Sequence, residues 1–232
     1  MKKSALSFLK VIVVSGVMVF SMGQSATAAA VDAYHIDLQY SADQAVIPEH
    51  LKAGEKARGV LISVAEFLDA RRIDDKKVIG HVRERDDSRV PIFSKSVTHT
   101  RTVAGAIGKY LKKAGYSVSD QVSPWDLQEA TLPKHTGKVV VGGRIDALDV
   151  TCWTGAFSND YKVDMKLTLV VADAARGKII YQGSVTVGYS RTDVSFSEEQ
   201  IGREAGIALA DAVEKIFEGK NPAQKIKEAI TQ

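Results

Sequence analysis

Three long stretches with the period of β-strands fill the second half of the sequence before its last helix, and they constrain the fold most. Residues 161–172 alternate most regularly, because every second side chain is apolar, as in a strand with one buried face. These apolar positions are Val163, Met165, Leu167, Leu169 and Val171. Residues 138–153 and 179–189 have a similar character, and short connections join the three stretches. We therefore expect an antiparallel meander.

Two other segments have the period of α-helices. In residues 98–114, apolar side chains recur at steps of three and four, and Gly115 is placed to end that helix in a left-handed conformation. A later helix begins at Ser197, which forms a capping box with Gln200, and Gly219 ends it.

Alternating polar and apolar residues at 34–40 and shorter apolar runs at 59–67 and 78–82 predict further strands before the first helix. Within the first long strand, Gly142 and Gly143 indicate a bulge or a bend. The element order is strands, helix, three long strands, helix. This order predicts an α+β fold, with one mostly antiparallel sheet and two main helices packed on one face.

The N-terminal segment has the features of a secretory signal peptide. Lys2 and Lys3 precede an apolar run, and small residues follow at Ala26-Thr27-Ala28. We expect cleavage near Ala28 or Ala30 and a soluble periplasmic product, because neither this run nor any later one is long enough to span a membrane. The expected division is a signal peptide at 1–28, an N-terminal strand and mobile segment at 29–58, a single α+β domain at 59–219 and a C-terminal tail helix at 220–232.

Charge and cysteine content narrow the classes of partner. The chain has 31 Lys and Arg residues against 28 Asp and Glu residues, but Lys2, Lys3 and Lys10 lie in the signal segment. The remainder is therefore balanced in charge, which argues against a nucleic-acid partner. Cys152 is the only cysteine, so there is no internal disulfide and no cysteine near the cleavage site for a lipid anchor. We interpret Cys152 as a buried strand residue in preference to a reactive thiol or a link between chains.

No motif predicts catalysis, a metal or a cofactor. The chain lacks a nucleophile elbow and a phosphate-binding loop. Its histidines have no spacing typical of a metal site; they are His35, His50, His81, His99 and His135. The acidic residues between Asp69 and Asp87 are interleaved with arginines and lysines, which is typical of a solvated surface.

Aromatic residues mark a candidate contact loop. Trp153 and Phe157 surround a predicted hairpin turn, and Tyr161 follows in the next strand. If these side chains are exposed, they form a contact for a protein partner or for lipid. If they are buried, they cover the end of the sheet, and the sequence leaves both interpretations open.

The segment Phe67-Leu68-Asp69-Ala70-Arg71, followed by Ile79-Gly80, resembles the YajG-like family of bacterial envelope lipoproteins. The similarity extends over roughly residues 59–219. It includes Lys112-Lys113-Ala114-Gly115-Tyr116-Ser117-Val118, Tyr181-Gln182-Gly183 and Ile216-Phe217. The resemblance implies a non-enzymatic envelope component with Asp69, Arg71, Ile79 and Gly80 as its motif residues. The chain departs from the family because it lacks the lipidated cysteine, and Asp69 with Arg71 can equally serve only to fix a turn.

We therefore expect a soluble periplasmic accessory or binding protein that is non-enzymatic and acts through contacts with an envelope protein. One alternative is an auxiliary component of lipid transport, which predicts an apolar groove or an exposed aromatic loop near Trp153 and Phe157. A second alternative is a hydrolase, which predicts a base, a nucleophile and an oxyanion donor converging in a cleft. The sequence leaves the oligomeric state open between a monomer and a dimer through the aromatic loop or a sheet edge.

Overall fold

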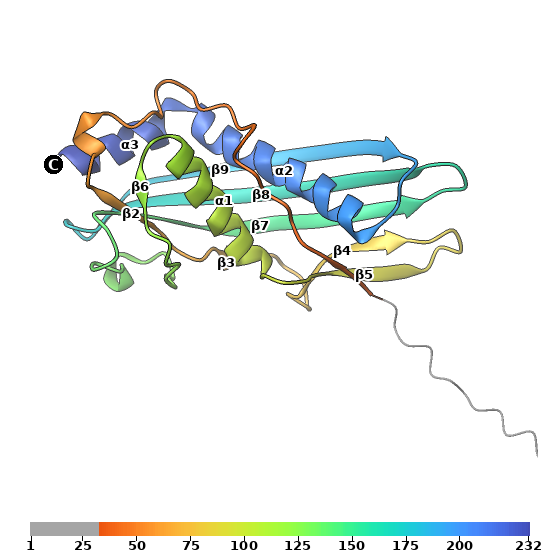
Figure 1. Ribbon diagram of the computed structural model, residues 1–232. Helices are drawn as coiled ribbons and strands as arrows, with labels where there is room; N and C mark the ends of the chain where they lie inside the picture. Colours follow the sequence, from red (N-terminus) through yellow and green to blue (C-terminus); the bar gives the residue numbers. More distant parts are fainter. Residues whose placement is uncertain (1–32) are drawn as a thin grey trace, which may run out of the picture. The chain divides into compact units, whose positions relative to one another are not determined.

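The computed structural model describes residues 33–232, so the expected signal peptide at 1–28 lies outside the described residues. The described chain forms a nine-stranded sheet and three α-helices (Figure 1). The strands are β1 (Tyr34–Ile36), β2 (Leu61–Val64), β3 (Leu68–Asp69), β4 (Val78–Arg83), β5 (Arg89–Ser94), β6 (Ser117–Val118), β7 (Val139–Thr154), β8 (Asn159–Asp173) and β9 (Lys178–Asp193). The helices are α1 (His99–Lys113), α2 (Glu198–Glu218) and α3 (Lys220–Thr231), with 3₁₀ turns at Glu55–Ala57 and Glu129–Thr131.

Strand β7 organises the sheet. On one side it pairs antiparallel with β8, and β8 pairs antiparallel with β9, which confirms the predicted meander. On its other side β7 pairs in parallel with β2 near its start, with β3 near its middle and with β4 near its end. The sheet is therefore mixed, and the expectation of a mostly antiparallel sheet was wrong. The parallel half arises because β2 and β4 return to β7 through long connections that include α1, as parallel pairing requires.

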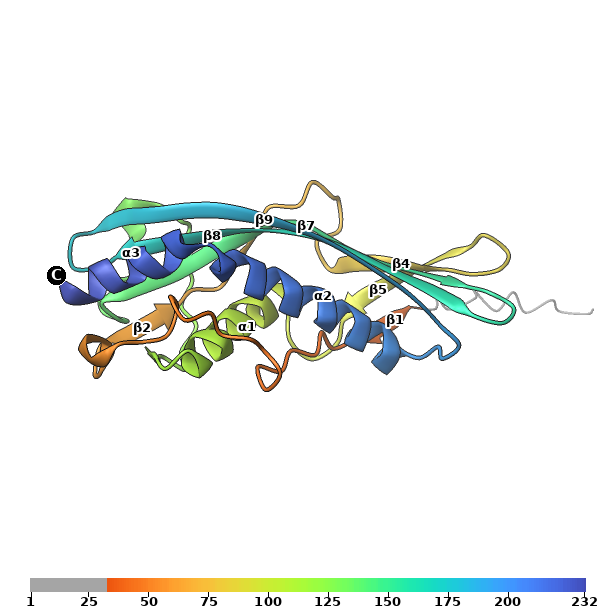
Figure 2. The ribbon, with the colours of Figure 1, turned by 90° about the horizontal axis from the view of Figure 1, so that it is seen from above.

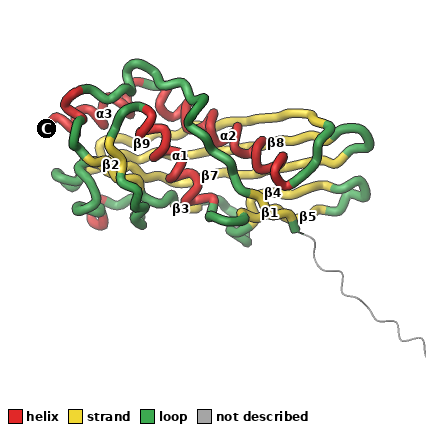
Figure 3. The backbone as a smooth tube through the Cα atoms, viewed as in Figure 1, coloured by secondary structure: helices red, strands yellow, loops and turns green. Residues whose placement is uncertain are grey.

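All three helices lie on the same side of the sheet (Figure 2). Helix α1 begins after Thr98, whose side chain accepts a hydrogen bond from Arg101 N, and α2 begins after Ser197, which accepts one from Gln200 N. These N-caps confirm the helix starts predicted from the sequence. The segment that follows β1 crosses the helices as a long loop (Figure 3), and its side chains Leu38, Tyr40 and Leu51 are buried.

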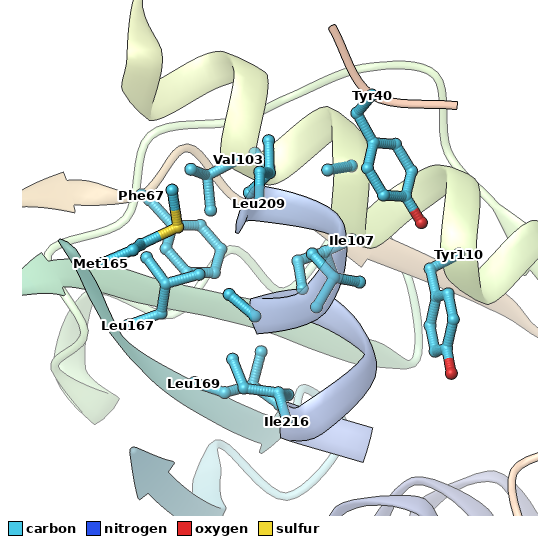
Figure 4. Close-up of a cluster of buried hydrophobic side chains, with 14 of the residues drawn as sticks. Tyr40, Phe67, Val103, Ile107, Tyr110, Met165, Leu167, Leu169, Leu209 and Ile216 are labelled. Atoms are coloured by element: carbon cyan, nitrogen blue, oxygen red, sulfur yellow. The ribbon is translucent and has the colours of Figure 1, made fainter. Parts of the chain in front are cut away.

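The main core fills the space between the helices and the sheet (Figure 4). The face of β8 predicted to be buried is buried: Met165, Leu167 and Leu169 point toward α1 and α2. Burying each such side chain contributes about 1.5–3 kcal/mol of transfer free energy. Cys152 in β7 is also buried and free, and burial raises the pKa of its thiol to about 12.

A second, smaller apolar cluster includes Val140 of β7, which points to the opposite face of the sheet from its neighbours Val139 and Val141. Trp125 and Leu132, from the connection before β7, belong to the same cluster. The cluster therefore covers part of the face that the helices leave open.

The two glycines of β7 serve close packing on both faces. A Cβ atom on Gly142 would lie 2.7 Å from the Trp125 ring, and one on Gly143 would lie 2.5 Å from the Phe67 ring. The register shift in β7 occurs between Ile145 and Ala147. The bulge predicted at the glycines was therefore misplaced, because the glycines are needed for two aromatic rings that come from distant parts of the chain.

Candidate functional site

Asp69 and Arg71 of the family motif meet His99, the first residue of α1, in a buried group that we call the Asp69 cluster (Asp69, Arg71 and His99). Arg71 is only 3% exposed and donates two hydrogen bonds to the Asp69 carboxylate, Nε to Oδ1 at 2.9 Å and Nη2 to Oδ2 at 2.7 Å. His99 Nε2 lies 2.9 Å from Asp69 Oδ2. The sequence signalled the Asp69–Arg71 pair but not His99, which is 30 residues away from Asp69 along the chain.

The electrostatics of the Asp69 cluster follow from burial and from these bonds. Burial by itself would raise the pKa of Asp69, but hydrogen bonds from Arg71 and His99 outweigh it and hold that pKa below its usual range. Burial lowers the pKa of His99, and the nearby Arg71 charge adds to this effect against the opposing influence of Asp69. His99 is therefore neutral at neutral pH, and its Nε2–H donates to the ionised Asp69.

The remaining donors of Arg71 bind the backbone. Nη1 donates to Val78 O at 2.8 Å and to Leu148 O at 3.4 Å, and Nη2 donates to Lys76 O at 2.6 Å. The guanidinium thus fastens the connection between β3 and β4 to β7. These contacts support the interpretation that Asp69 and Arg71 fix a turn.

A neutral imidazole oriented by a carboxylate is also the arrangement of a general base. Within residues 33–232, no hydroxyl or thiol is hydrogen-bonded to His99, and the Thr100 hydroxyl donates instead to Glu66. A cavity of about 650 Å³ lies beside His99, with Phe93 and Lys95 in its wall. The hydroxyl residues Ser94, Ser96, Thr98 and Thr100 line the same cavity. The geometry therefore provides an oriented imidazole to which no nucleophile is hydrogen-bonded.

Ile79 and Gly80, the other two motif residues, lie in β4 and have packing roles. Ile79 is buried in the main core. A Cβ atom on Gly80 would collide with the backbone of Val150 in the neighbouring β7. The structure therefore brings only Asp69 and Arg71 of the motif into one cluster.

The three residues of the candidate contact loop have different environments. Tyr161 is buried, and its hydroxyl donates to Ser195 O at 2.5 Å. Trp153 is half-buried near the end of β7. Phe157 is 94% exposed in the turn between β7 and β8. Phe157 is therefore available as a contact for a partner, whereas Tyr161 covers the end of the sheet.

Two further apolar residues are exposed at the same end of the sheet. Val194 is 79% exposed and Phe196 is partly exposed, both in the connection from β9 to α2. We call Phe157, Val194 and Phe196 the apolar tip; its connections extend beyond the helix layer together with the β4–β5 hairpin (Figure 2). All three residues line an open cavity of about 1070 Å³.

Hydrogen bonds hold the loops of the apolar tip in place. Arg85, in the β4–β5 hairpin, donates to Gly155 O through Nε at 3.1 Å and Nη2 at 2.5 Å. Asn159 Nδ2 lies 3.3 Å from the carbonyl oxygens of Val194 and Ser195. The Tyr34 and Phe196 rings meet edge to face with centroids 5.5 Å apart. The loops that carry the exposed side chains are therefore fixed to one another before any partner binds.

The charged residues that line the cavity of the apolar tip are Glu84, Arg85, Asp86 and Glu198. The β4–β5 hairpin carries three arginines and three acidic residues; they are Arg83, Glu84, Arg85, Asp86, Asp87 and Arg89. Arg83 Nη2 and Asp87 Oδ1 form an ion pair at 2.8 Å. The rim of the cavity is thus polar without an excess of positive charge.

Within residues 33–232 there is neither a cluster of metal-ligand side chains nor a membrane-spanning helix. No three His, Cys, Asp or Glu side chains in this part of the chain are arranged to hold a metal ion. None of the helices formed by these residues is both long and apolar enough to cross a membrane.

No protein-family model and no curated protein sequence matches the chain. Among solved structures, protein XCC0632 from Xanthomonas campestris, of family DUF330, superposes with a TM-score of 0.51 at 11% identity, covering 85% of this chain and 99% of that one. The putative neuraminyllactose-binding hemagglutinin homolog from Helicobacter pylori gives a TM-score of 0.40 at 12% identity, covering 84% and 97%. Lipoprotein GNA1162 from Neisseria meningitidis gives 0.35 at 14% identity, covering 69% and 99%. The chain thus shares its overall fold with XCC0632, a bacterial protein.

Proposed function

We propose that the protein is a non-enzymatic accessory or binding protein of the bacterial envelope, located in the periplasm, and that it docks on an envelope protein through the apolar tip. The observation that carries the proposal is the 94% exposure of Phe157 at the end of a sheet whose loops are fixed by hydrogen bonds. An exposed aromatic side chain on a preorganised support is typical of an interface anchor. The export pattern of residues 1–28 and the resemblance to YajG-like envelope proteins support the location.

The surroundings of Phe157 favour a protein partner. Burial of an exposed phenylalanine contributes about 1.5–3 kcal/mol, and Val194 adds a second apolar contact beside it. The charged side chains that line the cavity are Arg85 and the three acids Glu84, Asp86 and Glu198, so the rim has no excess of positive charge. An apolar centre with a polar rim is the usual anatomy of a protein interface, whereas an anionic membrane surface attracts an excess of Lys and Arg.

The bonds of the Asp69 cluster support a non-enzymatic role. Arg71 uses its donors on Asp69 and on three backbone carbonyls, and no hydroxyl or thiol within residues 33–232 is hydrogen-bonded to His99. A hydrolase of the serine or cysteine type places such a nucleophile within hydrogen-bonding reach of its base. The geometry accordingly supports a structural role for the cluster.

Lipid transport is a second candidate function, and Phe157 is the observation that favours it. Exposed aromatic and aliphatic side chains at a loop tip can insert into the interface of a bilayer. In this alternative the apolar tip contacts lipid, and the protein is an auxiliary component of an envelope transport system.

Crosslinking in cell envelopes, with recovery of protein and lipid through a tag after Gln232, tests the proposal. We expect a defined envelope protein to be captured by the unaltered chain and lost with Phe157→Ser and Val194→Ser together. Val46→Ser is the matched control, because Val46 is 72% exposed and lies outside the apolar tip. Capture that survives the double substitution would contradict docking through the tip. Phospholipid recovered without protein would support the lipid alternative.

A further inference from the structure

Strand β9 is a sheet edge with a long unpaired side. It pairs only with β8 among the described strands, and it runs from Lys178 to Asp193 as the outermost strand of the sheet (Figure 1). The backbone N–H and C=O groups that point away from β8 therefore have no partner strand. Such an edge is a template for pairing with another strand.

The features that protect sheet edges are absent from most of β9. Residues 179–190 contain no charged residue and no proline. The strands at the other borders are short: β6 is two residues long and β1 is three, and β5 behind β1 contains Pro91. Proteins that stay monomeric normally block an edge of this length with charges, prolines or a covering element. The contrast indicates that β9 has a partner strand in the functional protein.

We propose that the partner is β9 of a second copy of the chain, paired antiparallel about a twofold axis near Thr186. Identical strands that pair in this way form a closed dimer with a continuous sheet. The inference is independent of the apolar tip, since Phe157 does not lie on β9.

The sequence of β9 is self-complementary in this register. On the helix-covered face, Val185 comes opposite Val187 of the second copy. Tyr181 comes opposite Arg191, an arrangement that suits a cation–π contact. On the open face, Thr186 comes opposite its own equivalent.

The charges at the two ends of β9 also match. Ile179 of β9 pairs with Ala172 of β8, and Tyr181 pairs with Val171. Ile180 between them is therefore an extra residue, a β-bulge. This bulge shifts the register by one residue, so Lys178 comes opposite Asp193 of the second copy on the same face. Within one chain, Lys178 also pairs with Glu129 at 3.0 Å and Asp193 with Arg191 at 3.1 Å, so the contact between copies would join two existing ion pairs. Cross-strand pairs of opposite charge stabilise a sheet, and no like charges face each other here.

Sedimentation equilibrium of the purified chain tests the dimer. We expect a mass that rises with concentration from that of the monomer to twice that value. Thr186→Lys places two like charges across the axis and should weaken the dimer by about tenfold or more in Kd. Gln121→Lys is the control, because it adds the same charge at an exposed position between β6 and β7, away from β9. A monomer at all concentrations, or equal effects of the two substitutions, would overturn the proposal.

A second measurement tests the register. Cys152 is fully buried, so a thiol introduced at position 186 is the only accessible one in residues 33–232. Thr186→Cys should give a covalent dimer with a short thiol-specific crosslinker, whereas Thr151→Cys should not. A dimer that Thr186→Cys fails to crosslink would place the interface elsewhere and refute β9 pairing. If envelope capture fails while the dimer is intact, the proposed function of the apolar tip is contradicted and the pairing of β9 is not.

Discussion

Arg71 combines a buried ion pair with three bonds to backbone carbonyls, so its removal should be among the most costly single changes in the chain. Arg71→Met leaves the Asp69 carboxylate buried without its main partner. Breaking a buried pair in this way costs about 3–5 kcal/mol, and we expect a loss of this size in the free energy of unfolding measured with urea.

Arg101 provides the matched control, because it pairs with Glu66 at 3.1 Å but is 61% exposed. Arg101→Met should cost no more than about 1 kcal/mol, as exposed pairs do. Asp69→Asn combined with Arg71→Met should recover part of the loss, since no unpaired charge then stays buried. Equal costs for the two arginines would show that Arg71 does not stabilise the fold through the Asp69 cluster.

Residue patterns predicted part of this cluster. Asp69 and Arg71 stand two apart, so the sequence could indicate a turn held by their side chains. His99 joins them only because α1 begins beside β3, and that is a contact between distant segments. The same limit applies to the apolar tip: Phe157 was predicted from its own hairpin, but Val194 and Phe196 meet it only because the sheet brings two connections to one end.

At the scale of elements, alanine should change the free energy of unfolding in opposite directions at Gly143 of β7 and at Gly105 of α1. A Cβ atom on Gly143 would lie against the Thr168 carbonyl and 2.5 Å from the Phe67 ring, whereas one on Gly105 has nothing within 4 Å. Gly143→Ala should therefore lower the free energy of unfolding by about 1–3 kcal/mol through overpacking. Gly105→Ala should raise it by up to about 1 kcal/mol through helix propensity. Thermal unfolding of both variants checks the signs, and a neutral Gly143→Ala would mean that Phe67 moves aside freely.

The elements themselves were predictable where their signal is local. The alternation of β8 and the capping residue Ser197 depend on neighbouring positions, and the structure confirms them. The parallel pairing of β2 and β4 with β7 joins strands far apart in the chain, and no periodicity encodes it. For this reason the meander was predicted correctly and the mixed character of the sheet was not.

At the scale of the whole molecule, Cys152 can report the opening of the sheet. It lies in β7 between Val82 of β4 and Tyr161 of β8, so it becomes accessible only when the sheet separates. Burial also raises the pKa of its thiol to about 12, which suppresses the reactive thiolate. We therefore expect an excess of thiol reagent to label the native chain slowly.

When refolding is faster than labelling, the labelling rate gives the free energy of the opening. That value should equal the free energy of unfolding obtained with urea, because β7 pairs with strands from both halves of the sheet and cannot open alone. Thr186→Cys lies on the exposed edge strand, so its thiol should be labelled at once when the protein is dilute and monomeric. This variant is the control that shows the reagent to be active. A lower opening energy at Cys152 would show that β4 separates from β7 without the rest of the sheet. The β4–β5 hairpin, and the Arg85 contact that it supplies to the apolar tip, would then move independently of the core.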